Sequence, residues 1–245
     1  MTDRCLLVLQ LVCAVSFVLL ASTSCRSSNP YAVNEGELAQ RYLPSARHVD
    51  YPPDSLKGLT LRETDERIHF DLETTYEQLL LRWSTSYRVT TGRQPTRPLT
   101  YATFWSLEVS LASLQPELGV GSLSKDKADE LIAQRRKEYA ETIQIDVYWF
   151  GPPSQSAVAA PGVHARLRDA SGRSYQPMQK DYGPVREAFI GGTGTTSYRR
   201  NTFVFARTVD DTDLLANTDE LSLQLSPAGM GTTFRFQWTW DRPSL

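Results

Sequence analysis

The sequence predicts a mainly β protein, an antiparallel β-sandwich of immunoglobulin-like architecture with an α-helical insertion. Roughly seven to nine short segments between residues 59 and 242 alternate apolar and polar residues with the period of two that is typical of half-buried strands. One stretch, at about 101–141, instead repeats apolar residues at helical spacing. Turn-forming Gly, Pro, Asn and Asp separate the segments. The Cys and Trp pattern of antibody domains is absent, so the term immunoglobulin-like names an architecture only.

The bulk composition excludes several classes of protein. A chain of 245 residues can bury a core without disulfides, and its formal charge of −2 gives no overall basic field for nucleic acid. The three cysteines, Cys5, Cys13 and Cys25, all lie near the N-terminus. A body that begins after them has no internal disulfide, no thiolate nucleophile and no Cys-based zinc site.

The N-terminus carries an export signal. Cys5–Ala21 is a run of 17 uncharged residues preceded by Arg4. A membrane-spanning helix needs about 20 apolar residues, so the run is borderline for a span and long enough for the apolar region of a signal peptide. Small residues then lead into Cys25.

The segment Ser22–Cys25 resembles the lipobox of bacterial lipoprotein precursors. Ser24 fits that motif, whereas Ser22 stands where Leu is usual. The resemblance implies cleavage between Ser24 and Cys25, a lipid on Cys25, and a protein held in the cell envelope by that anchor. Arg26 replaces the Asp of inner-membrane retention, which favours the outer membrane in a Gram-negative cell. An ordinary secretory signal cleaved near Ser24 and an uncleaved anchor are the alternatives.

These observations divide the chain into three parts. Residues 1–24 form the signal peptide, residues 25–58 the lipidated cysteine and a flexible tether, and residues 59–242 the sandwich. The tether prediction rests on several prolines and on the lack of a sustained period, with a short helix expected over 35–42.

The expected elements of the body follow in chain order. Alternation predicts strands at 68–72 and 81–89. Helical spacing also fits the residues around 76–87, so the secondary structure of 74–80 stays undecided. Residues 91–98 are predicted to be a loop. Ser106 is placed to cap a short helix toward Leu114. Ser124 is placed to cap a longer amphipathic helix whose apolar face includes Ala128, Ile132 and Tyr139.

Strands return after the helices. Apolar residues alternate over 143–149, 163–167, 203–205, 221–225 and 234–240. Asp169–Gly172 is a turn signal that predicts a hairpin with 173–177. The layout of residues 65 to 240 is similar to that of uncharacterised bacterial lipoproteins that carry a helical pair in a β-sandwich. The resemblance implies a fold and no activity.

Two polar stretches invite a ligand interpretation. Gly191–Thr196 lacks the Lys and the following helix of a phosphate-binding P-loop, so an inter-strand loop is favoured, with anion binding by Arg199 and Arg200 as the alternative. The second stretch is the acidic segment at 210–220. It has Leu215 and Ala216 where an EF-hand loop needs a calcium ligand and a glycine, which favours a solvated connection between strands. The alternative is a cation shared by Asp210 and Asp219. The carboxylates of this stretch are Asp210, Asp211, Asp213, Asp219 and Glu220.

The remaining candidates have plainer interpretations. The histidines His48, His69 and His164 are too far apart for a zinc motif, and no Gly-x-Ser-x-Gly element is present. The polar helix face at 135–137 (Arg135, Arg136, Lys137) reads as solvated. The aromatic row at 234–240 is expected to be the inner face of a strand rather than a glycan-binding platform. Trp149 is likewise expected to lie in the core, with Tyr148 on the opposite side of its strand. The row consists of Phe234, Phe236, Trp238 and Trp240.

Three functions fit the sequence. The favoured one is a lipid-anchored, non-enzymatic envelope protein that binds or braces a protein or glycan partner. An exported hydrolase that acts on cell-wall or glycan material through carboxylates is the second, and a carbohydrate-binding module is the third. The sequence assigns no catalytic residue, metal ligand or cofactor; its assigned sites are the lipidation of Cys25 and the cleavage at Ser24–Cys25.

Overall fold

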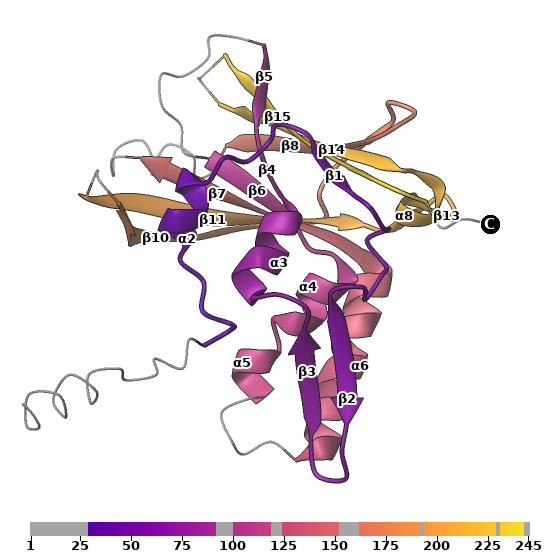
Figure 1. Ribbon diagram of the computed structural model, residues 1–245. Coiled ribbons are helices and arrows are strands. Elements are labelled where there is room, and N and C mark those ends of the chain that lie inside the picture. Colours follow the sequence, from indigo (N-terminus) through magenta and orange to yellow (C-terminus); the bar gives the residue numbers. More distant parts are fainter. Residues whose placement is uncertain are drawn as a thin grey trace, which may run out of the picture.

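A six-stranded and a five-stranded sheet face each other in the computed structural model, which describes residues 29–91, 100–118, 124–151, 162–191, 194–228 and 231–242 (Figure 1). The six-stranded sheet has the path β1-β15-β14-β8-β9, with β5 also paired to β15. Its strands are β1 (Arg47–Val49), β5 (Arg88–Thr91), β8 (Val163–Asp169), β9 (Ser174–Tyr175), β14 (Glu220–Pro227) and β15 (Thr233–Trp240).

The five-stranded sheet has the order β10-β11-β7-β6-β4. All of its pairings are antiparallel; in the other sheet, β1 joins β15 in parallel. Its strands are β4 (Ser84–Ser86), β6 (Thr100–Phe104), β7 (Thr142–Gly151), β10 (Gln179–Ile190) and β11 (Gly194–Ala206). The predicted fold class, a mainly β sandwich with a helical insertion, is confirmed.

The core between the sheets consists of the alternate side chains that the sequence places there. The whole aromatic row of β15 is buried, with Trp238 at 0 % and Trp240 at 3 % exposure. Phe203 and Phe205 of β11 face it from the other sheet. Large aromatic side chains bury 150–250 Å² each, so this row supplies much of the hydrophobic stabilisation. The glycan-platform interpretation of the row is therefore wrong.

The helical insertion extends from one side of the sandwich, where it lies beside a hairpin (Figure 1). The hairpin pairs β2 (Leu59–Glu63) with β3 (Ile68–Leu72). The helices are α3 (Tyr76–Arg82), α4 (Leu107–Ala112), α5 (Gln115–Leu118) and α6 (Lys125–Glu141). Ser106 and Ser124 cap α4 and α6 as the sequence predicts. Among the described residues, no helix has the length and apolarity that a bilayer crossing requires.

The strand expected over 81–89 is wrong at its start. Thr75 accepts a hydrogen bond from the backbone N–H of Gln78 and begins α3 instead. Leu79 and Leu80 are buried on one side of that helix, and only after Trp83 does the chain enter β4 and β5. The helical spacing prevails because the N-cap satisfies a free backbone donor and the apolar face finds a core.

The flexible tether expected over 25–58 is also wrong from residue 29 onward. The segment forms α2 (Glu35–Gln40), and β1 pairs in parallel with Trp238–Trp240. Leu38 and Val49 are buried. Local periodicity could not reveal this, because the partner strand lies about 190 residues away in the sequence.

A second apolar cluster covers part of the outer face of the five-stranded sheet. The rings of Tyr101 and Tyr148 stack with centroids 4.6 Å apart, and those of Phe150 and Tyr198 stack at 5.1 Å. Leu38 of α2 packs against this cluster. Strands β6 and β7 are therefore buried on both faces, which positions the site described next.

Finally, a short hairpin and helix precede β14. They are β12 (Thr208–Val209), β13 (Thr212–Asp213) and α8 (Leu214–Asn217).

Candidate functional site

A buried carboxylate lies on the outer face of the five-stranded sheet. Asp146 of β7 is 0 % exposed. Its Oδ1 accepts from the Thr202 hydroxyl at 2.7 Å and its Oδ2 from the Trp105 indole N–H at 2.8 Å. Burial raises the pKa of Asp146, although the charge of Arg200 and these hydrogen bonds oppose the increase.

Arg200 of β11 is the cationic partner of Asp146. Its Nε lies 3.1 Å from Asp146 Oδ2, and its guanidinium lies over the Trp105 ring at 5.9 Å. Partial burial lowers the pKa of Arg200, but the Asp146 carboxylate outweighs this and raises it, so the side chain is a permanent cation. The side chain is 48 % exposed, and within the described residues neither Nη makes a hydrogen bond to the protein. The four N–H donors on the two Nη atoms are thus available to a ligand, at a position fixed by the ion pair with Asp146.

Two adjoining hollows lie over this pair. They measure about 380 and 230 Å³, and Asp181, Arg200 and Thr202 line both. The first extends toward α6, where Arg135 lines it, and the second toward α2, where Glu35 lines it. We call the two hollows together the outer groove.

The phenols near the outer groove remain protonated at physiological pH. Burial raises the pKa of Tyr148 well above its ordinary value, and the charge of Asp146 adds to this. The same two causes raise the pKa of Tyr76. Such hydroxyls are neutral hydrogen-bonding groups rather than bases.

The geometry suits binding more than proton transfer. Both Asp146 oxygens already accept hydrogen bonds, so this carboxylate holds Arg200 in place and has little capacity left to act as a base or nucleophile. The outward guanidinium donors match the fork of a carboxylate or phosphate. Arg200 is therefore a candidate anion-binding group of the outer groove.

The second buried carboxylate lies elsewhere. Glu108 of α4 accepts from the Tyr51 hydroxyl at 2.7 Å, the Trp83 indole at 2.6 Å and the Gly58 N–H at 2.9 Å. It shares none of these partners with Asp146 and does not line the outer groove. Glu108 ties residues 51–58 to the helices, which is a structural role.

The Arg199–Arg200 pair predicted from the sequence is separated by strand alternation. Arg200 points into the outer groove, whereas Arg199 lies on the opposite face of β11. In the Gly191–Thr196 segment, Gly192 and Thr193 lie outside the described residues, and Gly194–Thr196 pairs with β10 as ordinary strand. The loop prediction is wrong for Gly194–Thr196, and Arg200 lies farther along β11 than this segment.

The acidic cluster disperses into separate roles. Asp213 accepts from the N–H of Leu215 at 2.8 Å as the cap of α8 and pairs with Arg207 at 2.9 Å. Glu220 pairs with Arg235 at 3.0 Å. Among the described residues, no three His, Cys, Asp or Glu side chains gather as metal ligands.

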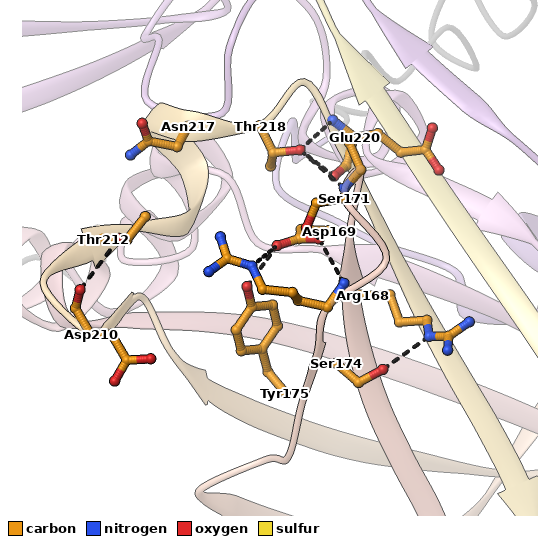
Figure 2. A network of polar contacts seen from close by, with 12 residues as sticks. Arg168, Asp169, Ser171, Ser174, Tyr175, Asp210, Thr212, Asn217, Thr218 and Glu220 are labelled. Carbon is orange, nitrogen blue, oxygen red and sulfur yellow. Dashed lines mark hydrogen bonds and ion pairs between the residues drawn. The ribbon is translucent and has the colours of Figure 1, made fainter.

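Figure 2 shows Asp210 and Glu220 on opposite sides of a turn organised by Asp169. Asp169 accepts from the hydroxyls of Ser171 and Tyr175, each at 2.6 Å. Burial alone raises the pKa of Asp169, but these hydrogen bonds outweigh it and lower the pKa. The expected hairpin at 169–177 is confirmed as the β8–β9 pairing.

The remaining candidates are spread over the surface. His48 and His164 lie on the outer face of the six-stranded sheet and His69 lies on β3, all three exposed. Of the basic helix residues, Arg135 lines the outer groove. Arg136 and Lys137 are exposed. Cys25 and Ser24 lie outside the described residues.

Sequence reasoning missed Asp146. The available signal was a charged residue in the middle of an otherwise apolar strand, at 143–149. Alternation places Asp146 on the polar side of the strand, and only the structure shows that Trp105, Thr202 and Arg200 surround it there.

Comparison with known proteins adds little to this description. No family model matches the chain, and no curated protein matches it. Among solved structures, bovine butyrophilin is similar over 64 % of this chain and 43 % of its own, at 9 % identity and a TM-score of 0.23. The chain thus spans less than half of that protein, and a likeness this weak says nothing about function.

Proposed function

We propose that this protein is a lipid-anchored cell-envelope protein whose folded body binds an anionic ligand in the outer groove without transforming it. The observation that carries the proposal is the fixed, half-exposed guanidinium of Arg200, held by a carboxylate whose own oxygens are occupied. This arrangement supports recognition of a carboxylate or phosphate. It gives no support to a carboxylate-dependent hydrolase.

The anchor in this proposal is a diacylated Cys25. Two acyl chains hold a protein firmly at a bilayer, since each buried CH₂ contributes about 0.8 kcal/mol. The described fold begins at Asn29, four residues after Cys25. Four extended residues reach about 14 Å, so the anchor keeps the body close to the membrane surface. The favoured location is the outer membrane in a Gram-negative cell.

The anchor is tested by metabolic labelling of cells that express Cys25→Ser. We expect the wild-type protein to take up radiolabelled palmitate and to fractionate with membranes. The variant should take up none and run at the size of the uncleaved precursor or appear in the soluble fraction. Label retained by Cys25→Ser would refute the lipid assignment.

The outer groove is tested with the full-length protein in detergent. The probe is acetyl-trialanine with a free carboxylate, compared with its C-terminal amide, and the readout is the NMR signal of the Trp105 indole N–H. We expect the carboxylate form to shift this signal and the amide to leave it unchanged. Arg200→Gln should abolish the shift, whereas Arg136→Gln on the exposed face of α6 should preserve it. An identical response to both probes would refute the site.

A further inference from the structure

The outer face of the six-stranded sheet is polar and strongly basic. Alternation directs every second side chain of β5, β8, β14 and β15 outward, while their neighbours fill the core. No large apolar side chain is exposed there among the described residues. The outward residues of the four strands include Arg88, Thr90, His164, Arg166, Arg168, Glu220, Gln224, Ser226, Thr233, Arg235 and Gln237. We call this surface the basic face.

The charges of the basic face are unbalanced. It carries four arginines against one carboxylate, Glu220, which is already paired with Arg235 at 3.0 Å. At its edge, His48 lies 3.4 Å from Asp241. Arg88, Arg166 and Arg168 therefore have no acidic partner among the described residues. The whole chain carries a formal charge of −2, so this concentration of positive charge is local.

Two shallow hollows run across the basic face. One, of about 550 Å³, is lined by His164 and Arg166 together with Gln224. The other, of about 280 Å³, is lined by Arg88 and Arg235 together with Gln237. Thr90 lines both, so the hollows form one track across β8, β14, β15 and β5.

We propose that the basic face binds an acidic polysaccharide through its uronate carboxylates. Guanidinium groups spaced along the track pair with carboxylates that repeat along a chain. Amide and hydroxyl side chains between them, such as Gln224 and Ser226, match sugar hydroxyls. The lack of exposed apolar anchors disfavours a protein partner, whose interface core is enriched in aromatic residues.

The direction of the basic face favours a glycan over a lipid headgroup. Near the start of the described chain, the Tyr31 hydroxyl donates to the Phe70 carbonyl at 2.7 Å and the Tyr31 ring lies 6.0 Å from that of Tyr76. This places the start beside β3 and α3, away from β8, β14 and β15 (Figure 1). A body anchored through Cys25 then holds the basic face away from its own membrane. Only this orientation depends on the proposed anchor; the binding chemistry does not.

The test uses the full-length protein in detergent and a polygalacturonate oligomer, with an uncharged dextran oligomer as control. Titration calorimetry should show binding of the uronate alone, which weakens as salt rises. The double variant Arg166→Gln/Arg168→Gln should weaken binding at least tenfold, and Arg88→Gln on a different strand should weaken it about threefold to tenfold. Melting temperatures verify that each variant is folded.

Matched controls separate this proposal from other outcomes. Arg62→Gln and Arg136→Gln remove exposed arginines elsewhere and should leave uronate binding unchanged; an equal loss in these controls would show diffuse charge attraction and overturn the proposal. Binding of unlipidated Cys25→Ser to phosphatidylglycerol vesicles but not to polygalacturonate would overturn it in favour of a lipid surface. The response of the Trp105 indole to acetyl-trialanine reports on the outer groove alone, so failure of the outer groove and failure of the basic face are distinguishable.

Discussion

Arg207 and Asp54, 153 residues apart in the sequence, form a two-pronged ion pair with N–O distances of 2.8 and 3.0 Å. Asp213 completes the cluster at 2.9 Å from Arg207. The Arg207 side chain is only 10 % exposed, and its guanidinium lies over the Tyr139 ring. Burial lowers the pKa of Arg207, but its hydrogen bonds to the two carboxylates outweigh this and raise it. One cation thus joins the N-terminal segment, the end of α6 and the start of α8.

Replacing this cation should destabilise the protein. Arg207→Ala leaves Asp54 and Asp213 without their shared partner, and because solvent screens both carboxylates we expect a loss of about 1–2 kcal/mol. Urea unfolding followed by tryptophan fluorescence measures the loss. The matched control is Arg242→Ala, because Arg242 and Asp219 form an exposed pair at 3.7 Å, and such pairs contribute less than about 1 kcal/mol. Equal effects of the two changes would contradict the structural role of Arg207.

Glu108→Gln should also destabilise the fold. The carboxylate accepts hydrogen bonds from three donors, and the amide NH₂ of Gln would face some of those donors with a donor of its own. A buried mismatch of this kind costs about 2–4 kcal/mol. Unfolding in urea measures it, with Glu130→Gln on the exposed face of α6 as the control. A change below about 0.5 kcal/mol would show that the network tolerates an amide.

The Asp146 carboxyl group should stabilise the folded state more at acidic pH than at neutral pH. Because its pKa is raised in the folded state, the folded protein binds this proton more tightly than the unfolded chain does. The stability of the wild type relative to Asp146→Asn should therefore rise as the pH falls from 7 toward 4. Asp169 provides the opposite case, because its pKa is lowered in the folded state. The wild type should therefore be more stable than Asp169→Asn at neutral pH and should lose this extra stability as the pH falls through the folded-state pKa of Asp169. Urea unfolding across pH measures both, and slopes of equal sign would contradict the assignment.

Tyr101→Phe should leave stability unchanged or raise it by up to about 1 kcal/mol. The Tyr101 hydroxyl is buried and has no hydrogen-bond partner within the described part of the chain, so its removal relieves an unsatisfied polar group while the stacked ring stays. Tyr31→Phe is the matched control, since that hydroxyl donates to Phe70 at 2.7 Å and its loss should cost about 1 kcal/mol. Thermal melting compares the two, and a clear destabilisation by Tyr101→Phe would reveal a partner for its hydroxyl.

Chelation should have no effect on stability. Asp213, Asp219 and Glu220 are paired with arginines, and among the described residues no three potential metal ligands gather, so we expect the fold to be independent of a cation at this place. Melting in the presence and absence of EDTA measures this. A fall of several degrees would restore the cation hypothesis for Asp210 and Asp219.

The anion-binding candidates show what each level of information contributes. Arg200 was visible in the sequence as one of two adjacent arginines, but alternation alone could not decide which of the two reaches a ligand. Alternation places Asp146 on the polar side of its strand, but a period of two shows only which residues share a side and not what covers that side. The surroundings of Asp146, and with them the position of Arg200, arise from the pairing of β7 with β11 and from the contact with Trp105.

The sequence by itself determined the sandwich, the capped helices, the apolar row of β15 and the resemblance of Ser22–Cys25 to a lipobox. These are local features, set by side-chain alternation, N-cap hydrogen bonds and hydrophobic runs. Only the tertiary structure decided that residues 29–58 belong to the folded body and that a basic face and an outer groove exist. The physical reason is that residues 29–58 pair with residues more than 150 positions away, and the outer groove depends on strand pairings such as that of Arg200 with Tyr148, 52 positions apart. Such non-local contacts leave no periodic signal in the chain.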